Sequence, residues 1–191
     1  MEKRTAEGSA SLIRVVITGP ECTGKTTLTN QLSGYYHTKG IPEYARDYIT
    51  GLNRHYTYQD VEHIARVQCD QASDVANPGV RLLFIDTYLV VTKIWFEVVY
   101  HQFPQWIEEE LQQKQVNLFL LCSADIPWTP DPVRENGGAM REVLFSMYRN
   151  ELERLGSRYV VISGSEEQRL NNAVKAINAF LKEMGHQELI K

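Results

Sequence analysis

Two patterns of hydrophobic positions alternate along this chain. Short apolar, β-branched runs at residues 12–18, 41–42, 80–86, 116–122 and 158–163 predict buried strands. Apolar residues at helical spacing predict helices at about 25–38, 58–76, 87–101, after Pro104, at 140–155 and at 166–183. The alternation of the two patterns indicates an α/β protein with a parallel sheet between two helical layers.

The fold class follows from the number and order of these segments. We expect a three-layer α/β/α sandwich with a five-stranded parallel sheet. Residues 1–11 are polar and small and predict a flexible N-terminal segment, followed by a single domain at 12–191. Residues 123–139 are rich in Pro, Asp and Gly and too long for an ordinary connection, which predicts a lid.

The first predicted strand leads into a phosphate-binding pattern. Gly19, Gly24, Lys25 and Thr26 have the spacing G-x-x-x-x-G-K-[ST]. Glycines let backbone N–H groups surround phosphate oxygens, the lysine reaches the β- and γ-phosphates, and the hydroxyl binds Mg²⁺. A glycine turn that binds nothing is the alternative. We predict an ATP site that also includes other residues of the loop: Glu21, Cys22, Thr23 and Thr27. With this motif the expected sandwich is a P-loop NTPase fold, nucleoside- and nucleotide-kinase-like with a lid.

Composition and charge limit the classes of partner that the protein is expected to bind. The 191 residues carry a net charge of −4, with a pI of about 5.8 and no basic block, so a nucleic-acid partner has no electrostatic support. The three cysteines are scattered without metal-ligand spacing. No secretory leader and no apolar run near 18 residues is evident, so we expect a cytoplasmic protein that binds no membrane. Self-association stays open.

Carboxylates that follow predicted strands are candidates for chemistry, because ligands gather at the carboxyl ends of parallel strands. Asp86 ends the strand in FIDT and could act on Mg²⁺ or, alternatively, cap the helix behind it. If the second strand lies beside the first, Glu43 faces the γ-phosphate and could act as general base. Arg46 and Asp47 could hold a sugar hydroxyl or the phosphate. The alternative is a surface helix start with an i, i+3 ion pair.

The predicted lid carries cations suited to phosphoryl transfer. Arg134 and Arg141 flank the flexible pair Gly137-Gly138, and the transfer needs positive charge over the phosphates as water leaves the cleft. An ordinary polar loop with solvated arginines is the alternative. Trp128 in such a loop suggests a ring to stack on.

Four stretches together resemble a known family: GPECTGKTTL, EYARDY, FIDTYLVVTKIW and PWTPDPVR. They are similar to the ribosylnicotinamide kinase domain of the bacterial trifunctional NAD-salvage regulator. The resemblance implies ATP-dependent phosphorylation of nicotinamide riboside to nicotinamide mononucleotide. It implies that Gly19, Gly24, Lys25, Thr26 and Thr27 hold ATP and Mg²⁺, with Asp86 as the FIDT acid. Further family motifs match on the substrate side and the lid: Glu43, Tyr44, Arg46 and Asp47, then Trp128, Asp131 and Arg134.

Several alternatives stay open at this point. Tyr44, Tyr48, Trp95 and Trp128 could each hold a flat pyridinium cation by stacking and cation–π attraction. The chain has no room for the family's DNA-binding domain, and its H-x-G-H adenylyltransferase signature is not matched, so we expect neither activity here. An ATPase or nucleotide-sensing module without nucleoside kinase activity is the alternative function.

Overall fold

In the described residues five strands form one parallel sheet, as predicted, and the structure gives their order as β2-β3-β1-β4-β5. The structure is a computed structural model that describes residues 12–73, 79–131 and 135–191. Strand β1 lies at the centre, paired with β3 on one side and β4 on the other. The strands are β1 (Ile13–Thr18), β2 (Gly40–Ile41), β3 (Leu82–Asp86), β4 (Leu118–Cys122) and β5 (Tyr159–Ile162).

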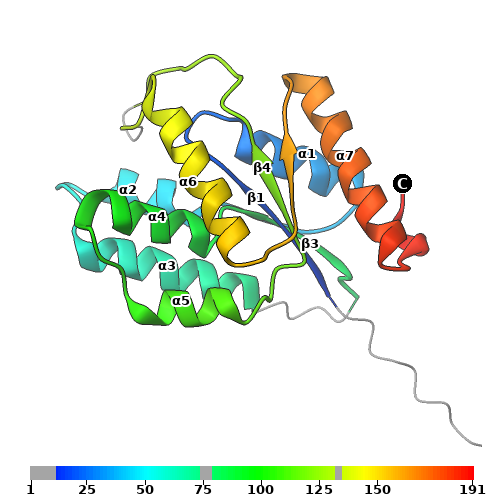
Figure 1. The fold of residues 1–191 in the computed structure, drawn as a ribbon, viewed down its shortest axis with the longest axis horizontal. Helices are drawn as coiled ribbons and strands as arrows, with labels where there is room; N and C mark the ends of the chain where they lie inside the picture. The colour runs from blue at the N-terminus through cyan, green and yellow to red at the C-terminus, as the bar shows by residue number, and fades with distance from the viewer. Residues whose placement is uncertain (1–11, 74–78, 132–134) are drawn as a thin grey trace, which may run out of the picture.

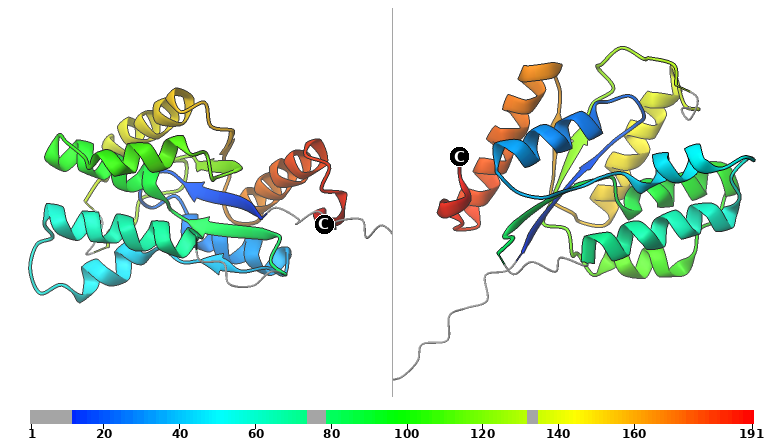
Figure 2. Two further views of the ribbon diagram at one scale, coloured as in Figure 1. Left: turned by 90° about the horizontal axis from the view of Figure 1, so that it is seen from below. Right: turned by 180° about the vertical axis from the view of Figure 1, so that it is seen from behind.

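Helices cover both faces of the sheet, as Figures 1 and 2 show. Helices α1 and α7 pack together on one face, and α3, α4, α5 and α6 form the other layer, with α2 against α3. The helices are α1 (Lys25–Tyr35), α2 (Tyr44–Gly51), α3 (Tyr58–Ser73), α4 (Leu89–Tyr100), α5 (Gln105–Gln112), α6 (Met140–Arg154) and α7 (Glu166–Glu183). A short 3₁₀ helix, η1 (Gln187–Leu189), follows.

Alternate residues of each strand enter two separate cores. In β1, Val15 and Ile17 pack with α1 and α7, whereas Val16 packs under the other helical layer. All five residues of β3 and all five of β4 are buried. This explains why these segments read as continuous apolar runs rather than as alternating ones.

Some element boundaries differ from the sequence prediction. Helix α1 ends at Tyr35, before the predicted end at about residue 38, and Gly40 belongs to β2. The helix expected from Thr87 begins at Leu89, because Thr87 has a left-handed φ of 64° and its N–H donates to Ile17 O at 3.0 Å. The predicted end of the helix at residue 76 lies outside the described residues.

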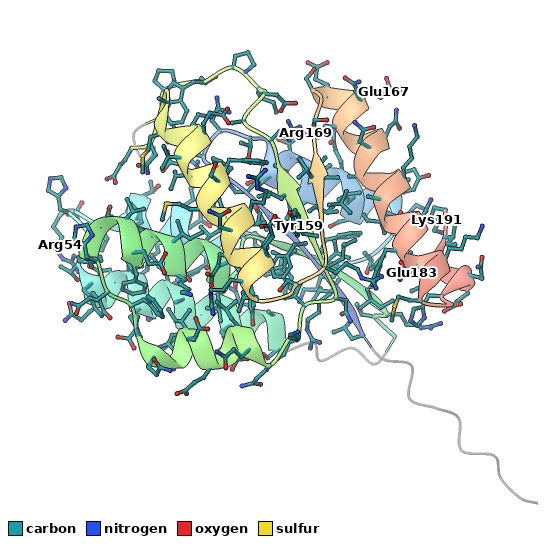
Figure 3. The ribbon with its side chains drawn as sticks, viewed as in Figure 1. Arg54, Tyr159, Glu167, Arg169, Glu183 and Lys191 are labelled. Atoms are coloured by element: carbon teal, nitrogen blue, oxygen red, sulfur yellow. The ribbon has the colours of Figure 1, made fainter. Side chains whose placement is uncertain are left out.

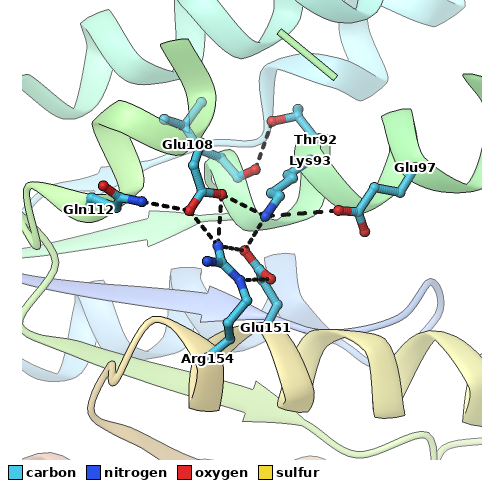
Figure 4. A network of polar contacts seen from close by, with 8 residues as sticks. Thr92, Lys93, Glu97, Glu108, Gln112, Glu151 and Arg154 are labelled. Carbon is cyan, nitrogen blue, oxygen red and sulfur yellow. Dashed lines mark hydrogen bonds and ion pairs between the residues drawn. The ribbon is translucent and has the colours of Figure 1, made fainter. Parts of the chain in front are cut away.

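A buried ion network joins α4, α5 and α6 (Figure 4). Lys93 Nζ donates to Glu151 Oε1 at 2.6 Å and to Glu108 Oε2 at 2.8 Å. Arg154 donates to the same two carboxylates. Burial raises the pKa of Glu108, but hydrogen bonds from Lys93 and Arg154 outweigh it and bring that pKa to about 2. The network fixes the two helices, α4 and α6, that supply much of the cavity wall.

Candidate active site

The phosphate-binding loop connects β1 to α1 in a conformation that only its sequence permits. A Cβ on Gly19 would lie 2.7 Å from Cys122 O, and the φ of Gly19 is 133°. Gly24 has a φ of 75° and is the N-cap of α1, with no side-chain cap on the helix. The first N–H groups of α1 are therefore left for an anion, which the helix dipole also favours.

Lys25 and Thr23 both turn back onto the loop. Lys25 Nζ donates to Pro20 O at 2.8 Å and Thr23 Oγ1 to the same oxygen at 2.9 Å. Thr26 and Thr27 are exposed at the start of α1. An ammonium held by one carbonyl keeps two donors, so a phosphate can engage Lys25 without first breaking an ion pair.

Asp86 lies at the carboxyl end of β3, next to the loop, and is 1% exposed. Among the described residues, neither of its carboxylate oxygens has a hydrogen-bond partner of ordinary geometry. Burial, together with the Glu43 carboxylate, raises the pKa of Asp86 to about 6, although Thr26, Lys25 and Arg46 act against the rise. Helix α4 has Tyr88 as its N-cap residue, so the alternative role of Asp86 as a helix cap is wrong. An orphaned carboxylate close to a threonine hydroxyl suits a divalent cation.

Glu43 reaches the site by a different route from the one expected. Strand β2 pairs with β3 rather than with β1, so the premise that placed Glu43 beside the first strand is wrong. Glu43 nevertheless immediately precedes α2 and lines the same cavity as the phosphate loop, because β3 brings that strand end to the same edge. No side-chain cap on α2 occupies its carboxylate.

A cavity of about 570 Å³ runs from the phosphate loop to an aromatic corner. Trp95 on α4 and Tyr56 from the loop before α3 form this corner, with ring centroids 4.9 Å apart in a T-shaped arrangement. Helix α6 adds Leu144 and Tyr148 to the wall. Other lining residues come from the loop and the α2 region: Gly19, Glu21, Cys22, Thr23, Gly24, Lys25, Thr26, Thr27, Glu43, Arg46 and Arg54.

Apart from Arg46, the remaining residues predicted for the substrate side do not line the cavity. The Tyr44 hydroxyl lies 3.2 Å from His63 Nε2, and Tyr48 donates to Asp60 at 2.8 Å. Arg46 lines the cavity but pairs with Asp131 of the predicted lid at 2.9 Å, not with a neighbour on its own helix. Asp47 and Trp128 are also absent from the lining. Of the four candidate aromatic residues, Trp95 alone contributes to the cavity wall.

The predicted lid is fastened to the phosphate loop. Glu21 accepts hydrogen bonds from the N–H groups of Glu135 and Asn136 at 3.0 and 3.1 Å, and from Asn136 Nδ2 at 3.0 Å. Arg141 is buried and donates to Cys22 O at 2.9 Å, and its guanidinium lies 5.9 Å from the centre of the Trp128 ring. Glu21 and Arg141, expected to contact nucleotide, thus hold the loop to the lid. Arg134 lies outside the described residues.

Sequence reasoning missed Tyr56, Arg54 and Asp60. Arg54, labelled in Figure 3, donates two hydrogen bonds to the nearly buried Asp60, at 2.6 and 2.9 Å. Hydrogen bonds from Arg54, then from Thr57 and Tyr48, hold the pKa of Asp60 far below its usual range. The run NRHYTY, rich in aromatic and polar residues between two helices, was the available signal.

The fold and this loop define a P-loop domain that binds nucleotides. Residues 14–169 match the model of a family described as AAA domain. Since the match covers most of the chain, the protein belongs to this family. Among the described residues, no helix combines the length and apolar character needed to cross a bilayer.

The relatives confirm the resemblance to the trifunctional regulator. The chain is 26% identical over 135 residues to the trifunctional NAD biosynthesis/regulator protein NadR of Salmonella typhimurium, covering 69% of this chain and 33% of that protein. It is 24% identical over 178 residues to NadR of Escherichia coli, covering 91% and 43%. The chain thus spans about one third to two fifths of the length of these relatives.

Solved structures share the fold. NadR in complex with NR superposes with a TM-score of 0.73 at 19% identity, over 88% of this chain and 50% of that one. A thymidylate kinase from Ehrlichia chaffeensis superposes with a TM-score of 0.57 at 11% identity, over 88% and 98%. At these identities the matches establish the common architecture.

Proposed function

We propose that this protein is an ATP-dependent kinase of a small nucleoside, with nicotinamide riboside as the first candidate. One observation carries the proposal: the phosphate loop, Glu43 and the Trp95–Tyr56 corner line a single cavity. A kinase needs the phosphoryl donor and the acceptor in one water-poor space with reacting atoms close together. The kinship to NadR, a structure of which was solved with NR, supports the same acceptor.

The charge distribution of the cavity suits a cationic acceptor. The lining arginines Arg46 and Arg54 are already paired with Asp131 and Asp60, neither of which lines the cavity. The lining also carries the carboxylates of Glu43 and Glu135, and the Glu135 carboxylate accepts a hydrogen bond from Tyr56 of the aromatic corner. A flat pyridinium ring placed against an aromatic face of this corner gains both stacking and cation–π attraction. Nicotinamide riboside has such a ring.

Each residue has a distinct task in the proposed reaction. The amides of the loop and Lys25 hold the phosphates and withdraw negative charge from the transferred group. Asp86 and Thr26 would hold Mg²⁺, which neutralises charge on the β- and γ-phosphates when it is bound. Glu43 accepts the proton of the sugar hydroxyl as its oxygen attacks phosphorus, and ADP carries away the electron pair of the broken P–O bond.

The test is product formation from MgATP with a panel of nucleosides, nicotinamide riboside first, followed by mass spectrometry. Formation of nicotinamide mononucleotide supports both the reaction and the acceptor. Phosphorylation of another nucleoside keeps the mechanism and replaces the acceptor. ATP binding without phosphorylation of any nucleoside would contradict the proposal and leave an ATPase or nucleotide sensor.

A further inference from the structure

Tyr56 stands at the junction of the acceptor end and the phosphate loop. Its ring forms the aromatic corner with Trp95, and its hydroxyl donates to Glu135 Oε2 at 2.9 Å. The backbone of Glu135 then donates to Glu21 of the phosphate loop at 3.0 Å. A continuous chain of contacts therefore runs from the wall of the acceptor site to the loop that binds ATP.

We propose that Tyr56 is a positioning residue that makes binding of the nucleoside and of ATP mutually favourable, acting through Glu135 and Glu21. This inference rests on the proposed function, since it needs a nucleoside at the aromatic corner. A base stacked on Tyr56 restricts the motion of its ring. Nucleoside binding therefore already bears part of the conformational-entropy cost of ordering the hydrogen bond from the Tyr56 hydroxyl to Glu135. The segment at 135–136 is then held over the phosphate loop before ATP arrives.

The loop end of this chain is held by several bonds. The Glu21 carboxylate accepts from two consecutive backbone N–H groups and from Asn136 Nδ2 at 3.0 Å. Arg141 fastens the adjacent start of α6 to Cys22 O at 2.9 Å. Any shift of residues 135–141 therefore moves or releases the phosphate loop, which is the linkage that cooperativity requires.

The hydroxyl of Tyr56 interacts with Glu135 and with the Trp95 side chain, and it is the donor in the hydrogen bond to Glu135. Burial raises the pKa of Tyr56 to about 12, so the hydroxyl keeps its proton at every pH at which the enzyme would be assayed. The other bridge from the substrate side, Arg46 to Asp131, joins side chains that are 42% and 23% exposed. Solvent screens that ion pair. Glu135 is exposed as well, but the Tyr56 ring is partly buried and packs against Trp95 in the cavity wall, where a nucleoside at the corner would contact it. Tyr56 is thus the residue to test.

The experiment measures the dissociation constant of nicotinamide riboside by calorimetry, with and without a saturating non-hydrolysable ATP analogue. For the unaltered protein we expect the analogue to tighten nucleoside binding at least about fivefold, the lower end of common coupling factors. Tyr56→Phe keeps the ring and removes the hydroxyl. The ratio of the two dissociation constants should fall toward one in this variant, whatever its nucleoside affinity is without the nucleotide analogue.

Tyr159→Phe is the matched control. Its hydroxyl also donates to a glutamate, Glu153, at 2.7 Å, but it lies on the edge strand β5 away from the cavity lining (Figure 3). This variant should keep the ratio of the unaltered protein. If Tyr56→Phe shows the same ratio of dissociation constants as the unaltered protein, the inference is overturned and the proposed kinase function stays intact. Failure of the unaltered protein to bind any nucleoside would overturn the proposed function as well.

Discussion

At the scale of single residues, Asp86 combines a burial cost with a proposed role in metal binding. Its pKa rises from 3.8 to about 6 in the folded chain. Between these values the folded state binds a proton that the unfolded chain does not, so without metal the free energy of unfolding should fall as pH rises through this window. The shift corresponds to about 2–3 kcal/mol at neutral pH.

Asp86→Asn should remove this pH dependence. In a chelator at pH 8 we expect the variant to gain about 1–2 kcal/mol in the free energy of unfolding, measured by urea titration, while losing Mg²⁺-dependent turnover. Asp70→Asn, on the exposed side of α3, removes the same charge at the surface. It should change neither the free energy of unfolding at pH 8 nor the Mg²⁺-dependent turnover. An equal decrease from pH 4 to 6 in Asp86→Asn and the unaltered protein would show that another group is responsible.

Glu43→Gln tests the proposed general base. The amide keeps the shape of the side chain but cannot accept the proton, so kcat should fall about 10²–10⁴-fold. The dissociation constant of ATP should change less than about threefold, because the phosphates are held by the loop. Glu167→Gln, exposed on α7 outside the cavity lining (Figure 3), is the control for the charge change. If ATP binding weakens and kcat stays, Glu43 is not the base.

At the scale of elements, the network of Lys93, Glu108, Glu151 and Arg154 determines how α4 and α6 face each other. Lys93→Met leaves two buried carboxylates with Arg154 as their remaining strong partner. Loss of one partner of a buried ion pair commonly costs about 3–5 kcal/mol. We expect a loss of that order in denaturant unfolding, together with a weaker nucleoside affinity as the cavity wall relaxes.

A double-mutant cycle isolates the interaction within the network. As a single substitution, Glu151→Gln should lower the free energy of unfolding. It should lower it less in the Lys93→Met background, because no lysine is present there to lose its carboxylate partner. Arg149→Met breaks an exposed contact of 4.0 Å on α6 and should cost under about 1 kcal/mol. Losses that simply add in the double variant would mean that the two residues act separately.

At the scale of the whole molecule, the sequence pattern was sufficient to predict the sheet and its two helical layers. It was not sufficient to predict the order of the strands within the sheet. Continuous apolar runs such as β3 are visible because both faces are buried. Strand β2 is two residues long, and nothing in its composition says that it pairs with β3. The position of Glu43 relative to the loop could therefore not be derived, since it depends on strand order.

The candidate site likewise has one part that could be predicted from the sequence and one part that depends on the folded structure. The phosphate loop could be predicted because its chemistry is local: glycines, a lysine and a threonine at fixed spacing. Tyr56 and Glu135 are 79 residues apart along the chain, and their hydrogen bond exists only because the folded structure brings their two loops together. Glu21 and Arg141 were expected to contact nucleotide, but Glu21 accepts from the N–H of Glu135 and Arg141 donates to Cys22 O, and no spacing rule reveals these backbone partners.

ATP should stabilise the folded molecule in proportion to its occupancy of the phosphate loop. At a free MgATP concentration about 100 times the dissociation constant, linkage predicts a gain of about 2.7 kcal/mol. For a chain of this size that gain raises Tm by about 5–10 °C in a thermal scan. Lys25→Ala should lose most of the increase while unfolding normally without ligand, because its ammonium is 2.8 Å from a backbone carbonyl rather than a carboxylate. Lys175→Ala, exposed on α7, should keep the full increase. An undiminished increase in Lys25→Ala would place ATP somewhere other than the loop at the centre of this fold.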